Sequence, residues 1–553
     1  MKSRFPVSKI VIVIGVIFVA VVSLWLFFGK YSNYITKGGV KNNPQGVVFI
    51  PKQSPLMVSL LINPDKLGNI ATLLPSNGEQ KRVFKAIEQL RTKLLSQAQV
   101  DSVEDLRDWL GDEITLAVTS LDYDHNIDNG AKPGYLLVAK NKSPELAKEF
   151  LQTYYAKQAV SNTAELIFEQ YKGVNLVYQR STIVDTEIKQ VAAAVVADFV
   201  LFANDLQVLK EAINNAQAVD LNLAHDLAYQ KAIASLTNPK VSLAYLNLPT
   251  TSAWITNQGE ISIPSVNESL TLSLALNPKG LIIHSALFGT TVEENQPPSL
   301  TKPPQTLAYI PDNSILSVVG VNLQDFWQQI KTGLDNNNPL PQLIYQGIHP
   351  LEESLQLDFA EDIFSYITGE YGLSLSIDEI NQELDWLFVT EKQEELLTDK
   401  LDNIAKDRSL SVGKLPLKNN TITAWTQLIT TSENNFSRLE AQVKGVHTQK
   451  DSYEILTNSV NVLSNNLSHP ENNLLQSTDF QSIIQDLPDN NDGYLYLKWQ
   501  LAEPYLVKKF PVIKIVELAF KPLFDNLQSL TLTSEGVENG IRRGTIFFNL
   551  VDR

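Results

Sequence analysis

The sequence predicts an α+β protein, in which an N-terminal transmembrane helix precedes two tandem homologous domains of mainly antiparallel sheet with helices packed on one face. Three observations predict this fold class. An uncharged apolar run lies near the N-terminus, a series of motifs occurs twice in the same order, and hairpin-like strand pairs alternate with segments of helical periodicity. The length of 553 residues is sufficient, since a domain takes about 100 to 200 residues.

The first element is the apolar run Ile10–Phe28, which contains no charged residue. At about 1.5 Å per residue, a helix of this length covers the roughly 30 Å hydrocarbon layer of a bilayer. The residues that follow lack the small-residue site of a cleaved signal peptide, so we expect an uncleaved signal-anchor. Basic residues before the run predict a cytoplasmic N-tail at 1–9. After a juxtamembrane linker at 29–45, the body is expected in the periplasm or thylakoid lumen.

Two copies of one domain follow, at 46–290 and 306–553, joined by a Pro-rich linker at 291–305. The first copy begins with VVFIPKQSPLMVSLLIN and the second with LAYIPDNSILSVVGVN. Each motif is an apolar run, an Ile-Pro turn and a second apolar run, and Pro51 corresponds to Pro311. We therefore expect the same order of strands and helices in both copies.

Later motifs also occur in both copies, and they predict three further pairs of equivalent residues: Gly111 and Gly369, Asn204 and Asn458, and Gly280 and Gly540. The first pair lies at the start of a strand. The asparagines lie at a strand-to-helix corner, where such a side chain can cap the helix that follows. The last pair is expected in the turn of a terminal hairpin.

The Ile-Pro turn, the Gly-Asp/Glu strand entry, the tandem arrangement and the uncleaved anchor resemble an uncharacterised, mainly cyanobacterial family of membrane-anchored proteins, the domain of unknown function 3352. The resemblance extends over nearly the whole chain. It implies a location outside the cytoplasm, at a thylakoid or plasma membrane. The shared motifs are structural, so the resemblance implies no reaction and no site residues.

Composition excludes several classes of function. A formal net charge of −16 disfavours binding to nucleic acid, which requires a basic surface. The absence of cysteine excludes thiolate catalysis, thiolate zinc sites and iron–sulfur clusters. The six histidines show no pair at the spacing of helical metal ligands, and no nucleotide-binding or serine-hydrolase motif is present. We expect no cofactor.

One loop has oxygen-bearing side chains at every second residue, namely Asp122, Asp124, Asn126 and Asp128. This spacing resembles a calcium loop in part. The glycine of the sharp turn and the closing bidentate glutamate are missing, so a polar loop between two strands is the preferred interpretation, with a cation site as the alternative.

The segment Pro504–Phe524, PYLVKKFPVIKIVELAFKPLF, combines lysines with large apolar residues, whereas the corresponding stretch of the first copy is polar. It suits contact with an anionic membrane surface or a protein partner. The alternative is a pair of core helices whose lysines extend to solvent. The candidate contact residues are Lys508, Lys509, Phe510, Ile513, Lys514, Phe520 and Lys521.

We therefore expect a non-enzymatic, single-pass membrane-anchored accessory or scaffold protein that binds or organises membrane or envelope protein partners. Two alternatives remain open. One is a carrier of lipid or another apolar ligand, and the other is an enzyme with an unrecognised carboxylate site.

Overall fold

The structure is a computed structural model, and it contains two compact units. Unit 1 comprises Met1–Gln296, Lys509–Leu527 and Val537–Arg553, and unit 2 comprises Pro297–Lys508 and Gln528–Gly536. The residues described are 39–61, 104–161, 164–181, 191–256, 268–289, 299–335, 352, 358–377, 384–394, 396–417, 420–433, 436–509, 513–514, 517 and 521–550.

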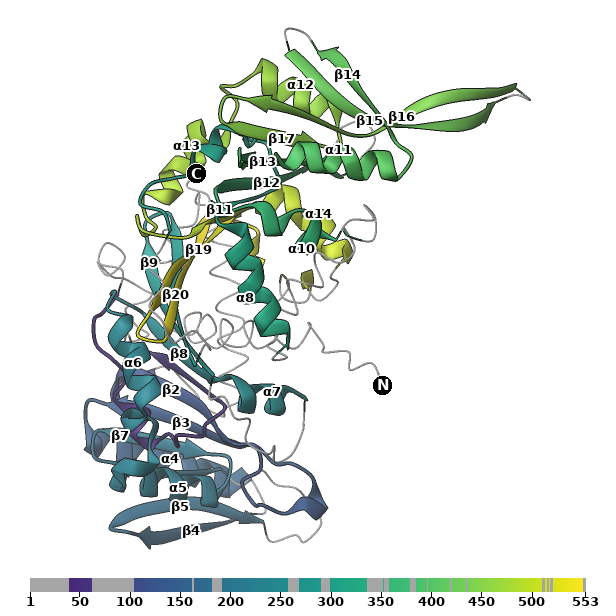
Figure 1. Ribbon diagram of the computed structural model, residues 1–553. Coiled ribbons are helices and arrows are strands. Elements are labelled where there is room, and N and C mark those ends of the chain that lie inside the picture. Colours follow the sequence, from purple (N-terminus) through teal and green to yellow (C-terminus); the bar gives the residue numbers. More distant parts are fainter. Residues whose placement is uncertain are drawn as a thin grey trace. The chain divides into compact units, whose positions relative to one another are not determined.

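Unit 1 is built on an antiparallel sheet (Figure 1). Its described strands are β1 (Leu56–Leu60), β2 (Leu110–Ser120), β3 (Gly134–Asn141), β4 (Ala164–Tyr171), β5 (Val174–Ser181), β6 (Ala192–Val196), β7 (Phe199–Ala203), β8 (Ser242–Asn247), β9 (Ser269–Asn277), β10 (Gly280–Phe288) and β20 (Ile541–Leu550). They follow one another across the sheet in the order β4-β5-β6-β7-β3-β2-β1-β8-β9-β10-β20.

Helices cover both faces of this sheet. The described helices of unit 1 are η2 (Gly46–Phe49), α3 (Glu104–Arg107), η4 (Ile127–Asn129), α4 (Pro144–Ser161), α5 (Leu206–Gln217), η5 (Val219–Leu221), η6 (Leu223–His225), α6 (Leu227–Ser235), α7 (Leu248–Thr256) and α16 (Lys521–Phe524). Successive side chains of a strand point to opposite faces. Along β3, Leu136 and Val138 join a cluster with residues of α5, whereas Ala139 joins a cluster with residues of α4.

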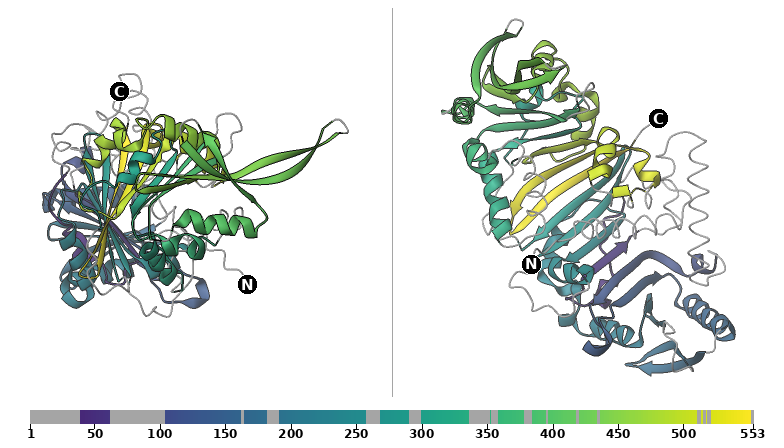
Figure 2. Two further views of the ribbon diagram at one scale, coloured as in Figure 1. Left: turned by 45° about the horizontal axis from the view of Figure 1, so that its top comes forward. Right: turned by 90° about the vertical axis from the view of Figure 1, so that its right-hand side faces the viewer.

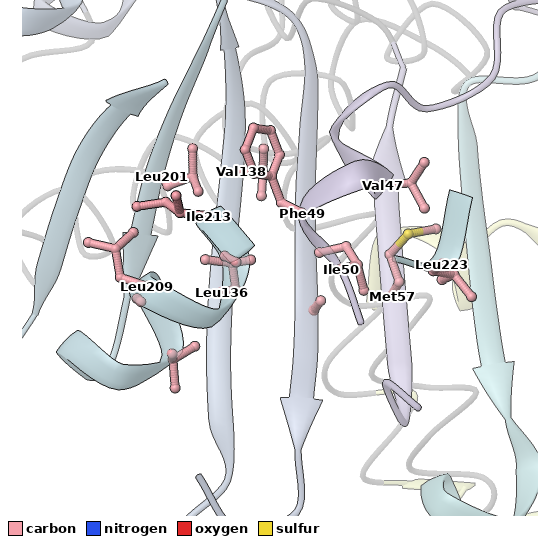
Figure 3. Packing of buried hydrophobic residues seen from close by; sticks show 14 of the residues in the cluster. Val47, Phe49, Ile50, Met57, Leu136, Val138, Leu201, Leu209, Ile213 and Leu223 are labelled. Atoms are coloured by element: carbon pink, nitrogen blue, oxygen red, sulfur yellow. The ribbon is translucent and has the colours of Figure 1, made fainter. Parts of the chain in front are cut away.

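The largest cluster of unit 1 lies between the sheet and the helices η2, α5 and η6 (Figure 3). The helix η2 contributes Val47 and Phe49, and the strand that follows contributes Met57, which is fully buried. Phe49 also contacts Phe199 edge to face, with ring centroids 5.4 Å apart. The Ile-Pro turn therefore folds the chain back over the sheet, which buries the apolar runs on both sides of it.

Unit 2 repeats this arrangement of strands. Its strands are β11 (Leu316–Val321), β12 (Glu370–Ile377), β13 (Leu384–Glu391), β14 (Ser411–Leu417), β15 (Asn420–Glu433), β16 (Phe436–Lys450), β17 (Tyr453–Thr457), β18 (Gly493–Lys498) and β19 (Leu527–Glu538), in the order β19-β18-β11-β12-β13-β17-β16-β15-β14. Part of β15 and β16 extends away from the sheet as a two-stranded ribbon (Figures 1 and 2).

The helices of unit 2 are η7 (Gln305–Tyr309), α8 (Leu323–Asp335), α10 (Phe359–Asp362), η8 (Phe364–Tyr366), α11 (Leu397–Asp407), α12 (Val460–Ser468), η9 (Leu474–Gln476), α13 (Thr478–Ile484) and α14 (Trp499–Lys509). Leu401 of α11 packs with Phe388 and Leu456 of the sheet. Phe480 of α13 contacts Tyr494 and Tyr496 of β18 edge to face.

The predicted fold class is wrong in two respects. The two copies do not form separate sheets, because all described strands are assigned to one sheet and β20, the last strand of the second copy, pairs with β10 of the first. Helices also cover both faces of the sheet in unit 1, not one face. Periodicity identifies strands, but the choice of a distant pairing partner depends on tertiary structure that a local pattern does not encode.

The predicted N-terminal transmembrane helix, Ile10–Phe28, is not shown and lies outside the described residues, as do the predicted N-tail and much of the linker at 29–45. Within the described part of the chain, no helix has both the length and the apolar character needed to cross a membrane.

The order of strands in the first copy recurs in the second, since β1 to β10 correspond in order to β11 to β20. Pro51 and Pro311 lie at the same place, because each forms an isolated bridge, with Asn222 and with Asn473 respectively.

The predicted match of Gly111 with Gly369 is wrong by one residue. Leu60 pairs with Ile114 in the first copy, and Gly320 pairs with Tyr371 in the second. These ladders make Glu113, the residue before Ile114, the counterpart of Glu370.

The match of Gly280 with Gly540 is also displaced by one residue. Gly540 lies inside its turn with φ +74°, next to Asn539 with φ +53°, whereas Gly280 already belongs to β10. Two successive positive φ angles are typical of a type I′ hairpin turn.

Candidate functional site

The loop between β2 and β3 contains the four residues of the candidate cation site, and their side chains bond within the loop. Asp122 accepts a hydrogen bond from the backbone N–H of Lys132 at 3.1 Å. Asp124 accepts one from the backbone N–H of Asn126, and Asn126 accepts one from that of Asp128, both at 3.1 Å. These are the bonds of successive turns, so the side-chain oxygens stabilise the loop.

A second set of contacts holds Asp124 in its ionised form. The amide of Asn129 donates to its carboxylate at 2.9 Å, and Lys132 Nζ lies 3.4 Å from the same oxygen. The hydrogen bond from Asn129 is the largest cause of a lowered pKa of Asp124, and Lys132 adds to it. No group of three or more His, Cys, Asp or Glu side chains within the described ranges could hold a metal ion.

The candidate contact segment Pro504–Phe524 is only partly described. Lys508 at the end of α14 and Lys514 are exposed, and Ile513 is half-buried. Phe510 and Phe520 lie outside the described residues, as do the side chains of Lys509 and Lys521. Leu523 of α16 packs at the edge of an apolar cluster that contains Leu60, Val241, Leu276 and Leu281. A contact role for the lysines therefore stays a prediction, and one apolar residue of the segment belongs to the core.

Glu113 of β2 is a buried carboxylate, with 5% of its surface exposed. One oxygen accepts a hydrogen bond from the backbone N–H of Gly46 at 2.6 Å, and the other accepts one from Gln45 at 2.8 Å. Burial raises the pKa of Glu113, and the two hydrogen bonds oppose this shift. Its counterpart Glu370 likewise accepts a hydrogen bond from a backbone N–H, that of Thr306. Both carboxylates thus accept hydrogen bonds from backbone N–H groups at the N-terminal end of a 3-10 helix. This role is structural.

His447 is a buried histidine, and its carboxylate partner Asp402 is half-buried. Its Nε2 lies 2.9 Å from Asp402 Oδ1, and the indole N–H of Trp425 donates to the same oxygen at 2.6 Å. The group joins α11 to β15 and β16. This geometry explains how α11 is fixed on the sheet. Within the described part of the chain, no Ser, Thr or Lys side chain that could act as a nucleophile is hydrogen-bonded to His447.

Strand β9 buries its polar side and leaves three leucines of its apolar side only partly buried. Ser269, Thr271 and Ser273 are exposed by 3% or less. The residues between them, Leu270 and Leu272, are half-buried, and the same holds for the next leucine, Leu274. This is the reverse of the usual arrangement, in which the apolar side of a strand is covered.

The reversal follows from the position of α6. This helix packs on β9 and β10, where Ala232 and Leu236 meet Ala286 and Ile541. These residues share a face with the hydroxyls of β9, because Thr271 pairs with Ala286. The small side chains allow the helix to approach the sheet closely. The leucines then point to the opposite face.

The half-buried apolar side chains continue over two neighbouring strands. Leu274 pairs with Ile283 of β10, and Ile283 pairs with Ile546 of β20. We use the name leucine face for the following set of half-buried residues on one side of unit 1: Leu270, Leu272, Leu274, Ile283, Leu287, Ile546 and Phe548. Leu248 and Trp254 of α7 pack beside it.

Strand β19 of unit 2 has the same reversed pattern as β9. Ser529, Thr531 and Thr533 are exposed by 1% or less, and Leu532 between them is 40% exposed. Two strands at equivalent places in the two copies thus direct hydroxyls inward and leucines outward. The recurrence makes the pattern a property of the repeated domain.

The sequence contained the signal for the leucine face, because SLTLSLALN alternates hydroxyl and apolar residues at the period of a strand. That alternation assigns the leucines to one face. It does not say which face a helix covers, and the packing of α6 on the hydroxyl side decides this.

Comparison with known proteins gives a family and no activity. Residues 10–550 match the family model described as "Protein of unknown function (DUF3352)". No curated protein matches. Two solved structures of TP0453 are similar to this chain. Crystal form IV shows 11% identity and a TM-score of 0.23 over 45% of this chain and 82% of that one. Crystal form I shows 10% identity and a TM-score of 0.25 over 46% and 82%. Scores this low carry no argument about fold or function.

Proposed function

Because the chain belongs to the DUF3352 family of proteins of unknown function, we propose its function from geometry: it is a non-enzymatic accessory protein that binds a protein partner through the leucine face. The observation that carries this proposal is the reversed pattern of β9. Burying serines and threonines while leucines are only half-buried is unfavourable unless a further apolar surface covers the leucines.

The charge of the chain specifies the partner further. The formal net charge of −16 favours approach of a positively charged molecule. A partner surface that is apolar at its centre and cationic at its rim would match both properties. Apolar centres with polar rims are typical of stable protein interfaces.

A second candidate function is a carrier of lipid or another apolar ligand. It is favoured by the continuity of the leucine face, where the row Leu274, Ile283 and Ile546 crosses three strands without a polar side chain. An acyl chain could lie along such a row, because apolar ligands need surface and few polar contacts.

The leucine face is tested by replacing Leu272 and Ile283 with Gln in the full chain. The two side chains are half-buried, so the substitution changes the face more than the core. We expect at least a tenfold loss of co-purified partner protein, because two central apolar contacts are lost. The matched control is Leu227→Gln at the start of α6, a leucine that is 71% exposed in the same unit. Partner recovery should be measured by quantitative mass spectrometry of both purified variants and of the unmodified chain.

The outcome also separates the two candidate functions. Loss of a co-purified protein with no change in bound lipid supports the accessory role. Loss of stoichiometric lipid from an organic extract, with protein recovery unchanged, supports the carrier. Equal recovery of both in the double variant would refute a binding role for the leucine face.

We also propose that the body works outside the cytoplasm, in the periplasm or thylakoid lumen. The support is the complete absence of cysteine, since a chain in an oxidising space then has no thiol to mispair. Protease should digest the body in sealed vesicles whose non-cytoplasmic side faces outward, which are right-side-out for the plasma membrane and inside-out for thylakoids. Protection of the body until the vesicles are opened would contradict this location.

A further inference from the structure

We propose that β4, the edge strand of unit 1, pairs in antiparallel fashion with β4 of a second copy of the chain. Among the described strands, β4 pairs with β5 alone, and it is the outermost strand at the foot of the sheet in Figure 1. Its second edge therefore presents backbone N–H and C=O groups that no described strand satisfies. An open edge of this kind is a template for another strand.

The strand β14, which holds the equivalent edge position in unit 2, shows the features that prevent such pairing. Its sequence SVGKLPL contains Gly413, Lys414 and Pro416. Proline removes a hydrogen-bond donor, and lysine on an edge is unfavourable to a neighbouring strand. The sequence of β4, AELIFEQY, contains no glycine, proline or lysine. The same chain thus protects one edge and leaves the other open.

Phe168 lies near the centre of β4 and is 70% exposed. An aromatic side chain of this exposure on an open edge strand is costly in water. In an antiparallel pair centred on Phe168, the two copies of this residue face each other. Directly opposed aromatic residues on neighbouring strands attract one another, so the pairing would cover both rings.

The charged side chains of β4 favour one register of the β4–β4 pair. In the register centred on Phe168, Glu165 lies opposite Tyr171 of the second copy. The ring of Tyr171 has Lys210 Nζ at 5.3 Å and Lys172 Nζ at 5.8 Å from its centroid, and Lys210 also pairs with Glu169 at 2.7 Å. In this register the carboxylate of Glu165 therefore lies near cations and opposes no acidic residue. A shift that centres the pair on Ile167 instead would place Glu165 opposite Glu169. Opposed like charges are destabilising, which favours the first register.

The chain already contains a junction of the same kind. β10 and β20 are the corresponding last strands of the two copies, and they form one antiparallel ladder inside unit 1. At its middle, His284 pairs with Thr545, and Nδ1 of the histidine lies 3.1 Å from the threonine hydroxyl. Edge-to-edge pairing of equivalent strands is therefore compatible with this fold, and β4 would use it between two chains. The inference concerns a surface other than the leucine face, so it does not depend on the proposed function.

The first test measures the mass of the full chain by analytical ultracentrifugation in mild detergent, from about 1 to 100 μM, because one strand pair is a small interface. The unmodified chain should show a concentration-dependent dimer. Phe168→Glu should raise the dissociation constant at least tenfold, and Phe168→Trp should preserve the dimer. The control is Leu415→Glu on β14, where a leucine is 44% exposed. Far-ultraviolet circular dichroism should be the same for all variants.

The second test uses the absence of cysteine in the natural chain. The proposed register places Leu166 opposite Gln170 of the second copy, at a separation that a disulfide can bridge. A mixture of Leu166→Cys and Gln170→Cys chains should cross-link on mild oxidation, and each variant alone should cross-link only at the slow rate of a Leu415→Cys control. A monomer at all concentrations, or equal cross-linking in every sample, would overturn the proposal.

Discussion

Glu113 is a buried carboxylate whose pKa shift makes the stability of the protein depend on pH. Both of its carboxylate oxygens accept backbone N–H groups, yet burial still raises its pKa. Folding therefore favours the protonated form of this group. Its contribution to stability is complete below the ordinary pKa near 4.5 and is lost as the pH rises through the raised value.

Replacing Glu113 by Gln removes this titration. The variant loses one hydrogen-bond acceptor at every pH, and this loss is a constant offset. Relative to the unmodified chain, the free energy of unfolding of the variant should increase as the pH rises from about 4 to 7. Denaturant unfolding at a series of pH values measures this difference. Asp112→Asn, at a side chain of the same strand that is 58% exposed, is the matched substitution for comparison. A flat difference for Glu113→Gln would contradict the assignment.

The corner residues Asn204 and Asn458 show what local sequence can and cannot predict. Sequence placed both at a strand-to-helix corner, and the structure confirms this position. The predicted capping role is wrong, because the caps are the next residues, Asp205 and Ser459. Asn204 instead accepts a hydrogen bond from the backbone N–H of Tyr135 at 2.7 Å. That contact spans distant residues, so capping preferences alone could not reveal it.

At the scale of elements, the ladder between β10 and β20 depends on one glycine. Gly280 has φ +154° and pairs with Asn549. A Cβ atom at this position would overlap the carbonyl oxygen of Phe548 on the neighbouring strand. Only glycine therefore permits the two backbones to approach at this point.

We expect Gly280→Ala to weaken the attachment of β20 selectively. Amide hydrogen exchange in β20 should become faster, while exchange in β4 and β5 should stay unchanged, because those strands lie at the other end of the sheet. The control is Gly173→Ala, which also has a positive φ, +83°, but has open space around its Cβ position. It should cost only about 1 kcal/mol of backbone strain. Equal exchange in β20 for both variants would show that the close approach is unimportant.

Strands and turns with a strong local pattern were predicted correctly. The distant strands and helices that pack against them were not. The strand pairs with tight turns are confirmed, including β9–β10 and β19–β20. The leucine face was missed because alternation in β9 says which residues share a side and not which side is covered. The candidate cation loop lies between β2 and β3, where the sequence placed it, and its hydrogen bonds with Lys132 and Asn129 involve residues beyond the motif.

At the scale of the whole molecule, sequence revealed the duplication but not the way in which the copies are joined. The motif order is confirmed by the strand order of both copies. The pairing of β10 with β20 connects residues more than 250 positions apart. Neither strand differs locally from one that ends a separate domain, so the pattern predicted two separate domains of mainly antiparallel sheet. Long-range pairing is specified by the fit of whole edges, which a motif search does not measure.

This pairing also sets the order of events during synthesis. The ribosome completes β10 roughly 250 residues before β20, a delay of some tens of seconds at about 5 to 20 residues per second. During that interval the sheet of unit 1 lacks its final strand, and the edge of β10 can recruit another nascent chain. Closing so long a loop is slow, which prolongs the exposure further. We therefore expect the nascent chain to be most prone to pairing with other chains during the interval before its last strand is synthesised.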